Sequence, residues 1–265
     1  MPIDGVRVHG AAGQPVLLLP GGAESCDGFF PGLPEGLVAD PGCRVVVHDR
    51  PGTGTSATPG SLATAASHLN ALINELGCGP VVVVGQSLGG AVALLLARDH
   101  PENVAGIVML DPTPINDPRL SARVERAVRV IGPLAKIRPV HKVLTALTRA
   151  SVKRTMRDLR LRPDCAAALD RTCDLDYPTL DRAVRGLTRL SADFHESELP
   201  RLPSVLITAD RKPDHPVRQA HARLATALGA SLLSWPGTTH NVQVDHPDET
   251  LAAVRELVAR IESAT

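Results

Sequence analysis

The sequence predicts an α/β fold in which a mostly parallel central sheet is covered by helices on both faces. Two observations lead to this prediction: six short runs are almost wholly apolar, and segments with helical patterns alternate with them. Strands of a parallel sheet that is buried on both faces read as continuous apolar runs of this kind. A length of 265 residues allows one large domain, or a core domain with a sizeable insertion.

The predicted elements follow one another in a regular order. The expected strands are residues 16–19, 44–48, 81–84, 105–110, 205–208 and 232–235. The expected helices are residues 61–76, 88–99, 215–228 and 247–262. Helix boundary signals agree with this, because Pro101 follows the end of the second helix and Pro247 and Asp248 lie in the first turn of the last.

The alternation stops between residues 113 and 200. This stretch has several helical patterns, no strand pattern, and prolines at positions 118, 133, 139, 163 and 178. We therefore expect an all-helical cap at 113–200, placed on the carboxyl edge of the sheet. The core domain would then comprise residues 1–112 and 201–265.

Composition narrows the class of protein. The formal charges sum to zero, which argues against a nucleic-acid partner. The five cysteines show no metal-binding spacing and the first residues form no apolar signal, so we expect reduced thiols, no metal and a cytoplasmic protein. The longest apolar run, 81–97, is shorter than the roughly 20 residues of a membrane-spanning helix and is interrupted by glycines. We expect no transmembrane segment.

A single serine stands between the apolar strand 81–84 and the helix 88–99. Residues 85–89 (GQSLG) form a G-x-S-x-G motif in the strand–turn–helix context that a nucleophile elbow requires. Small residues around Ser87 permit the strained turn that would expose its hydroxyl at the start of a helix. The alternative interpretation is a chance Gly/Ser turn.

Three further segments join this motif in resembling the α/β-hydrolase superfamily, and the resemblance covers essentially the whole chain. They are residues 17–22 (LLLPGG), 49–56 (DRPGTGTS) and 236–240 (PGTTH). The resemblance implies a serine esterase or lipase-like enzyme with a helical cap. It also implies that His240 is the general base and that the backbone N–H groups of Gly22 and Leu88 form an oxyanion hole. The family usually has His-Gly in the oxyanion loop, where this chain has Pro20-Gly21.

The acid of the expected triad has three candidates. In many family members it lies in the turn after the strand that follows the cap, but here Lys212 occupies that position. Asp210 and Asp214 are two residues away on either side, and Asp111 ends the strand before the cap, where some branches carry their acid. We expect Asp111, with Asp210 and Asp214 as alternatives. The alternative, non-catalytic interpretation is that Asp111 caps a turn and that Asp210 and Asp214 are solvated loop charges.

The expected cap is strongly basic. Residues 119–162 contain thirteen lysines and arginines against two acidic residues, Glu125 and Asp158. This pattern indicates either a solvated outer face of amphipathic helices or attraction of an anionic partner. The predicted function is a cofactor-independent serine hydrolase that cleaves a small, possibly anionic, carboxylic ester through an acyl-enzyme. Alternatives are thioesterase, amidase, lactonase, perhydrolase or carbon–carbon hydrolase chemistry, or a non-catalytic ligand receptor on the same fold. The oligomeric state is not predicted.

Overall fold

The computed structural model describes residues 3–135, 137–174 and 176–264. Within them, seven strands form one sheet in the order β1-β3-β2-β4-β5-β6-β7. β1 is antiparallel to β3 and every other neighbouring pair is parallel. The strands are β1 (Val6–His9), β2 (Pro15–Leu19), β3 (Arg44–His48), β4 (Val81–Gln86), β5 (Val104–Leu110), β6 (Ser204–Ile207) and β7 (Ser231–Leu233). The predicted mostly parallel sheet is confirmed.

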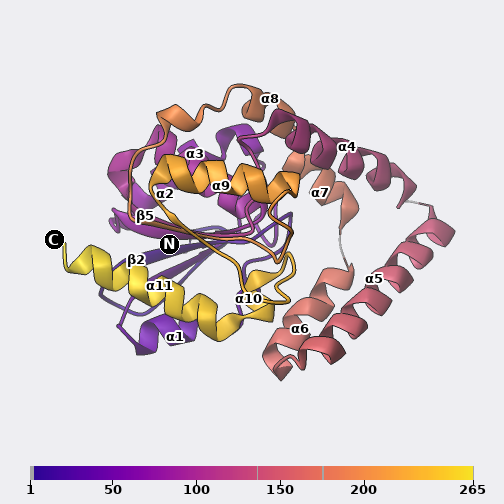
Figure 1. Cartoon of the computed structure of the whole chain (residues 1–265), viewed down its shortest axis with the longest axis horizontal. Helices are drawn as coiled ribbons and strands as arrows, with labels where there is room; N and C mark the ends of the chain where they lie inside the picture. The colour runs from indigo at the N-terminus through magenta and orange to yellow at the C-terminus, as the bar shows by residue number, and fades with distance from the viewer. Residues whose placement is uncertain (1–2, 136, 175, 265) are drawn as a thin grey trace.

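Helices cover both faces of the sheet (Figure 1). β4 shows why, because its alternate valines enter two separate apolar clusters: Val81 and Val83 on one face, Val82 and Val84 on the other. One face packs against α2 (Ala65–Leu76), α3 (Leu88–Asp99) and α9 (Pro216–Leu228). The opposite face packs against α1 (Leu33–Ala39) and α11 (Pro247–Glu262). An apolar run buried on both sides therefore holds the centre of the sheet together.

The chain between β5 and β6 is helical throughout its described part. The helices are α4 (Pro118–Leu134), α5 (Arg138–Leu159), α6 (Pro163–Arg171), α7 (Tyr177–Val184) and α8 (Leu187–Ala192), with short 3₁₀ turns at Thr172–Asp174 and Glu196–Glu198. Four of the prolines noted in the sequence lie in the first turn of α4, α5, α6 and α7. There the missing N–H has no helical partner to lose, so each proline starts a helix rather than breaking one.

These inserted helices are attached in two groups (Figure 1). α4, α7 and α8 join the large apolar cluster above α3, with Ala183, Val184 and Leu187 buried in it. α5 and α6 form a small cluster of their own with α10 (Val242–Asp245), in which Val152, Cys165 and Val244 are buried. The two groups are therefore held by different parts of the core. The boundary at residues 113 and 200 remains a prediction.

The structure departs from the expected elements at short or half-exposed segments. β1, α1 and α10 were not predicted. The second helix begins at Ala65, after a 3₁₀ turn at Leu62–Thr64, rather than at residue 61. The last strand ends at Leu233 rather than at residue 235. No helix in the described ranges has the length and apolar character needed to cross a bilayer.

Candidate active site

Ser87 occupies a sharp turn between β4 and α3. Its φ of 50° lies in the left-handed region, which a residue with a side chain adopts only when its surroundings enforce it. The surroundings do so here: the Ser87 N–H donates to the Leu110 carbonyl at 3.1 Å, and the Ser87 carbonyl accepts from the Thr113 N–H at 2.8 Å. The hydroxyl is thereby held at the amino end of α3, beside the end of β5.

The positions around Ser87 require glycine because other parts of the chain lie too close for a side chain. A Cβ on Gly85 would overlap the carbonyl of Gly89, and a Cβ on Gly89 would overlap the carbonyl of Leu19. A Cβ on Gly90 would lie 2.7 Å from Cβ of Pro112. The glycines of the motif thus allow α3 to lie directly against the strand ends, which is the context that the sequence analysis assigned to residues 85–89.

His240 lies between Ser87 and a carboxylate. Its Nε2 is 2.9 Å from Oγ of Ser87, and its Nδ1 is 2.6 Å from Oδ2 of Asp111. Because a carboxylate only accepts, Nδ1 carries the proton and Nε2 is left to accept the serine hydroxyl. The side-chain amide of Gln86 donates to the His240 carbonyl at 2.8 Å and fixes the loop. The His240 side chain is 52% exposed, so the site is open to solvent.

Asp111 is buried at the carboxyl end of β5, with a φ of 44°. Besides His240, its carboxylate accepts hydrogen bonds from the Ala209 N–H at 3.0 Å and from both terminal nitrogens of Arg211, with Nη2 at 2.7 Å from Oδ2. Burial alone would raise the pKa of this carboxyl. The hydrogen bonds from Arg211 and His240 outweigh it and hold the pKa well below its ordinary value. Asp111 is therefore ionised at neutral pH.

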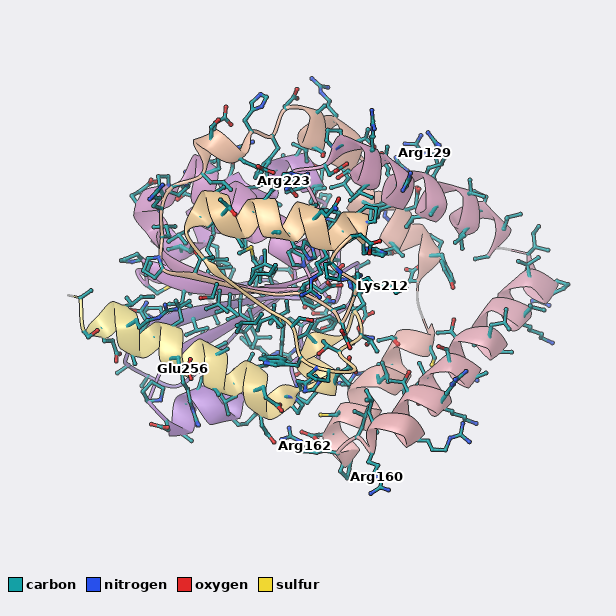
Figure 2. The ribbon with its side chains drawn as sticks, in the orientation of Figure 1. Arg129, Arg160, Arg162, Lys212, Arg223 and Glu256 are labelled. Carbon is teal, nitrogen blue, oxygen red and sulfur yellow. The ribbon has the colours of Figure 1, made fainter. Side chains whose placement is uncertain are left out.

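The structure brings neither alternative acid to His240. The carboxylate of Asp210 accepts from the Gly237 N–H at 3.0 Å, and both Asp210 and Asp214 are exposed loop residues. Lys212 is also exposed and lies on the loop after β6 (Figure 2). Of the three candidate acids, Asp111 is the one that contacts the histidine.

Gly22 and Leu88 lie at the ends of β2 and β4 that flank Ser87. Gly22 has a φ of 54°, and Leu88 is the first residue of α3. Neither N–H donates to an acceptor within the described residues. The first N–H groups of a helix have no internal partner, and together with the helix dipole they favour an anion. Both groups are therefore available to a ligand.

The two groups of inserted helices approach this site from different sides. A Cβ on Gly22 would lie 3.3 Å from Cδ1 of Leu180 in α7. A Cβ on Gly237, in the loop that carries His240, would lie 3.7 Å from Cδ2 of Leu159 in α5. Apolar side chains of α7 and α5 thus border the site, one next to Gly22 and the other next to the loop that carries His240.

Two residues near Asp111 were not found from the sequence. Arg211 pairs with Asp111, which is 100 residues earlier in the sequence. The sequence around either residue contains no pattern that predicts this pair. His221 is fully buried, with Nδ1 2.9 Å from Thr208 Oγ1 and Nε2 2.7 Å from the Pro112 carbonyl. Burial lowers the pKa of His221 to about 4, so the ring is neutral. Its one sequence signal is a histidine on the apolar face of α9.

The described residues contain no group of three or more His, Cys, Asp or Glu side chains placed to hold a metal ion. The site brings together a hydroxyl, an imidazole, a buried carboxylate and two unpaired backbone N–H groups.

Residues 16–254 match the sequence profile of the alpha/beta hydrolase family. The chain belongs to the α/β-hydrolase family. Its predicted resemblance to that superfamily is confirmed. The site described above lies at the strand ends, where an α/β-hydrolase elbow presents its nucleophile.

Known proteins similar to this α/β-hydrolase include lipases and esterases. The chain is 46% identical over 82 residues to lipase LipV of Mycobacterium tuberculosis, a match that covers 30% of the chain and 29% of LipV. It is 28% identical over 271 residues to the dihydrolipoyllysine-residue acetyltransferase component of the acetoin cleaving system of Cupriavidus necator, covering 96% of the chain and 67% of that protein. The matched stretch is thus less than a third of the length of LipV.

A solved structure supports the fold. A thermophilic esterase from Thermogutta terrifontis aligns with a TM-score of 0.75 at 20% identity, over 97% of this chain and 93% of the esterase. At that identity the likeness concerns the fold and not the substrate.

Proposed function

We propose that this α/β-hydrolase is a serine hydrolase that cleaves a carboxylic ester through an acyl-enzyme. The observation that carries the proposal is the continuous hydrogen-bonded line from Ser87 Oγ through His240 to Asp111, with contacts of 2.9 Å and 2.6 Å. A hydroxyl, a base and a buried carboxylate in this order are the arrangement that activates a serine nucleophile. The match to lipase LipV supports an ester as the substrate class.

In the first half of the reaction, Ser87 Oγ attacks the ester carbonyl carbon while His240 Nε2 takes the hydroxyl proton. The negative charge that develops on the carbonyl oxygen is stabilised by the N–H groups of Gly22 and Leu88. The ionised Asp111 holds the Nδ1–H tautomer and stabilises the imidazolium. Collapse of the tetrahedral intermediate breaks the bond to the alcohol oxygen, which leaves with the proton from His240.

In the second half, His240 takes a proton from a water molecule as the water oxygen attacks the acyl carbon. The same N–H groups stabilise the second tetrahedral intermediate. Its collapse releases the carboxylic acid and returns the proton to Ser87 Oγ. The exposure of His240 is compatible with this step, because water has direct access to the imidazole.

Intact-mass analysis after treatment with a fluorophosphonate probe tests the nucleophile. Wild-type protein should gain one phosphonyl adduct per chain, whereas Ser87→Ala should gain none. A thermal unfolding curve of Ser87→Ala serves as the folding control. Labelling of both proteins to the same extent would place the reactive group elsewhere and contradict the role of Ser87.

A substrate panel then tests the reaction class. Esters, thioesters, amides, lactones and peracid-forming conditions are compared at equal concentration, with Ser87→Ala as the blank. Fastest turnover of simple esters supports the proposal. Preference for another class assigns the same site to that chemistry. Tight ligand binding by a folded protein that neither labels nor turns over would favour a ligand receptor on this fold.

A further inference from the structure

Arg50 is a buried cation with too few partners. It follows β3, is 4% exposed, and donates one hydrogen bond within the described residues, from Nη2 to the Gly22 carbonyl at 2.6 Å. Its Nε is buried and has no acceptor in that part of the chain. A guanidinium carries five N–H donors, and buried charges in proteins are paired or bound to an ion. Four donors of Arg50 thus have no partner among the described residues.

The neighbouring carboxylate does not satisfy Arg50. Asp49 accepts from the Cys26 N–H at 2.5 Å, from Ser25 Oγ at 2.9 Å and from the N–H and hydroxyl of Thr55 at 2.7 Å each. Its oxygens are thus used to hold the loops together. Among the described residues, no carboxylate oxygen lies within ion-pair distance of the Arg50 guanidinium.

Arg50 lines a cavity of about 130 Å³ beside the oxyanion loop. The cavity lies between the loop after β3, the start of α2 and α7, and its polar lining consists of Arg50, Thr53, Ser61, Thr64, His68 and Arg182. Its volume is well above the roughly 10–15 Å³ that one water molecule requires, and below the roughly 300 Å³ of a typical pocket for a whole organic ligand. The size suits a small ligand or one group of a larger one.

The lining is cationic without a compensating acid. Arg182 reaches the cavity from α7, where its Nη2 donates to Thr179 Oγ1 at 2.6 Å. His68 stacks on the buried ring of His48 with centroids 5.3 Å apart. The residues that line this cavity include no aspartate or glutamate. Guanidinium groups are donors that recognise a carboxylate or a phosphate, and this cavity has two of them, whereas the hydroxyls of Thr53 and Thr64 already donate to the carbonyls of Arg50 and Ser61.

We propose that this cavity is an anion site that takes a carboxylate or phosphate group, with Arg50 and Arg182 as its cationic ligands. An anion bound there would also hold the guanidinium that supports the Gly22 carbonyl, in the loop next to Ser87. The site thus goes beyond the proposed hydrolase function, and anion binding to it can be measured without turnover.

Isothermal titration calorimetry of the whole chain with sodium phosphate and with sodium acetate, at constant ionic strength, tests the site. Arg182→Gln removes one cationic ligand. Arg185→Gln is the matched control, because Arg185 lies on the turn after the same helix, pairs with Asp181 at 2.8 Å and does not line this cavity. A charge-assisted hydrogen bond lost from the anion corresponds to about a tenfold weaker Kd.

We expect wild-type protein and Arg185→Gln to bind one anion with the same Kd, and Arg182→Gln to bind it about tenfold more weakly. The His68 imidazole resonances should shift during the same titration. Arg50→Lys should weaken binding as well, and its thermal unfolding midpoint shows whether the loop is intact. No binding up to tens of millimolar, or equal weakening by Arg182→Gln and Arg185→Gln, would overturn the site and leave water as the partner of Arg50.

Kinetics distinguishes the two sources of the anionic group. If it belongs to the substrate, phosphate should raise the KM of a carboxylate-bearing ester, and Arg182→Gln should raise that KM while a neutral ester is unaffected. If it is a separate effector, phosphate should change kcat for the neutral ester. A protein that binds phosphate but hydrolyses neither ester would retain the anion site and contradict the proposed hydrolase function alone.

Discussion

Arg211 binds Asp111 through both terminal nitrogens of its guanidinium, while the same carboxylate accepts a hydrogen bond from His240. The carboxylate proposed to act as the triad acid therefore contacts both a guanidinium and an imidazole. Asp111 is 1% exposed and the Arg211 side chain is 21% exposed, so solvent screens this pair weakly. The pair bears on the stability of the fold and on the pKa of Asp111.

Replacing Arg211 by Gln should therefore raise the pKa of Asp111, because one of the two side chains whose hydrogen bonds lower that pKa is lost. An NMR titration of the Asp111 carboxyl group measures this change. Removing one partner of a buried ion pair should also lower the free energy of unfolding by roughly 3 kcal/mol. The control is Lys212→Gln at the next, exposed position. An unchanged pKa of Asp111 in Arg211→Gln would contradict this role of the guanidinium.

The three aspartates should differ sharply in their effect on turnover. Asp111→Asn should reduce kcat by about 10⁴, because an amide at this position favours the wrong histidine tautomer. Asp210→Asn and Asp214→Asn remove exposed loop charges that do not contact His240 and should change kcat by less than about twofold. Steady-state kinetics on one ester decides this, and a large loss for Asp210→Asn would exclude Asp111 as the sole acid.

The elbow glycines can be tested through stability. Gly89→Ala places a methyl group against the Leu19 carbonyl. We therefore expect its free energy of unfolding, measured in urea, to be about 3 kcal/mol lower than that of wild type. Gly132→Ala is the matched control, since it lies within α4 and its Cβ would be 3.7 Å from the nearest atom. That variant should change the free energy of unfolding by less than about 1 kcal/mol, because the gain in helix propensity is opposed by the ring of Pro133, which crowds a side chain at the preceding position. Similar urea midpoints for the two variants would argue against the tight packing of α3 on β2.

His221 should make the protein less stable as the pH falls from 6.5 to about 4. The pKa of this buried ring is lowered from 6.5 to about 4, so in that window the unfolded chain binds a proton that the folded protein does not. The loss amounts to roughly 3 kcal/mol across the window.

Urea titrations at several pH values measure this dependence. His221→Gln keeps an N–H donor for the Pro112 carbonyl but does not titrate. The slope of its free energy of unfolding against pH should therefore correspond to about one bound proton less than the slope of wild type. His195→Gln, at an exposed position, is the control. An unchanged slope in His221→Gln would show that this ring is not the titrating group.

The parallel strands were predictable because burial on both faces leaves an unbroken apolar run, as in Val81 to Val84. β1 lacks that signal: it is a four-residue edge strand in which Arg7 and Val8 are exposed, and its pairing with β3 is antiparallel. α1 is only seven residues long and begins at Leu33, followed directly by Pro34. Short elements are positioned by contacts with distant segments, which a local pattern does not record.

The sequence could predict those site residues that lie at the end of a strand or helix with a clear sequence pattern. Ser87 is marked by the motif between strand and helix, and Asp111 by the end of an apolar strand, although the latter remained one of three candidates. The position of Arg211 on Asp111 and the missing partner of Arg50 depend on how separate loops meet. Side chains such as these follow from tertiary geometry alone.

The division of the inserted helices into two groups has a consequence for motion. The cluster that fastens α5 and α6 to α10 is small, whereas α4, α7 and α8 are fastened to the main core. Segments with few buried apolar contacts undergo local unfolding at lower free energy. Amide hydrogens of α5 and α6 should therefore exchange with deuterated solvent sooner than those of α4 and α7. A ligand could then enter beside the histidine loop while the oxyanion side of the site stays in place.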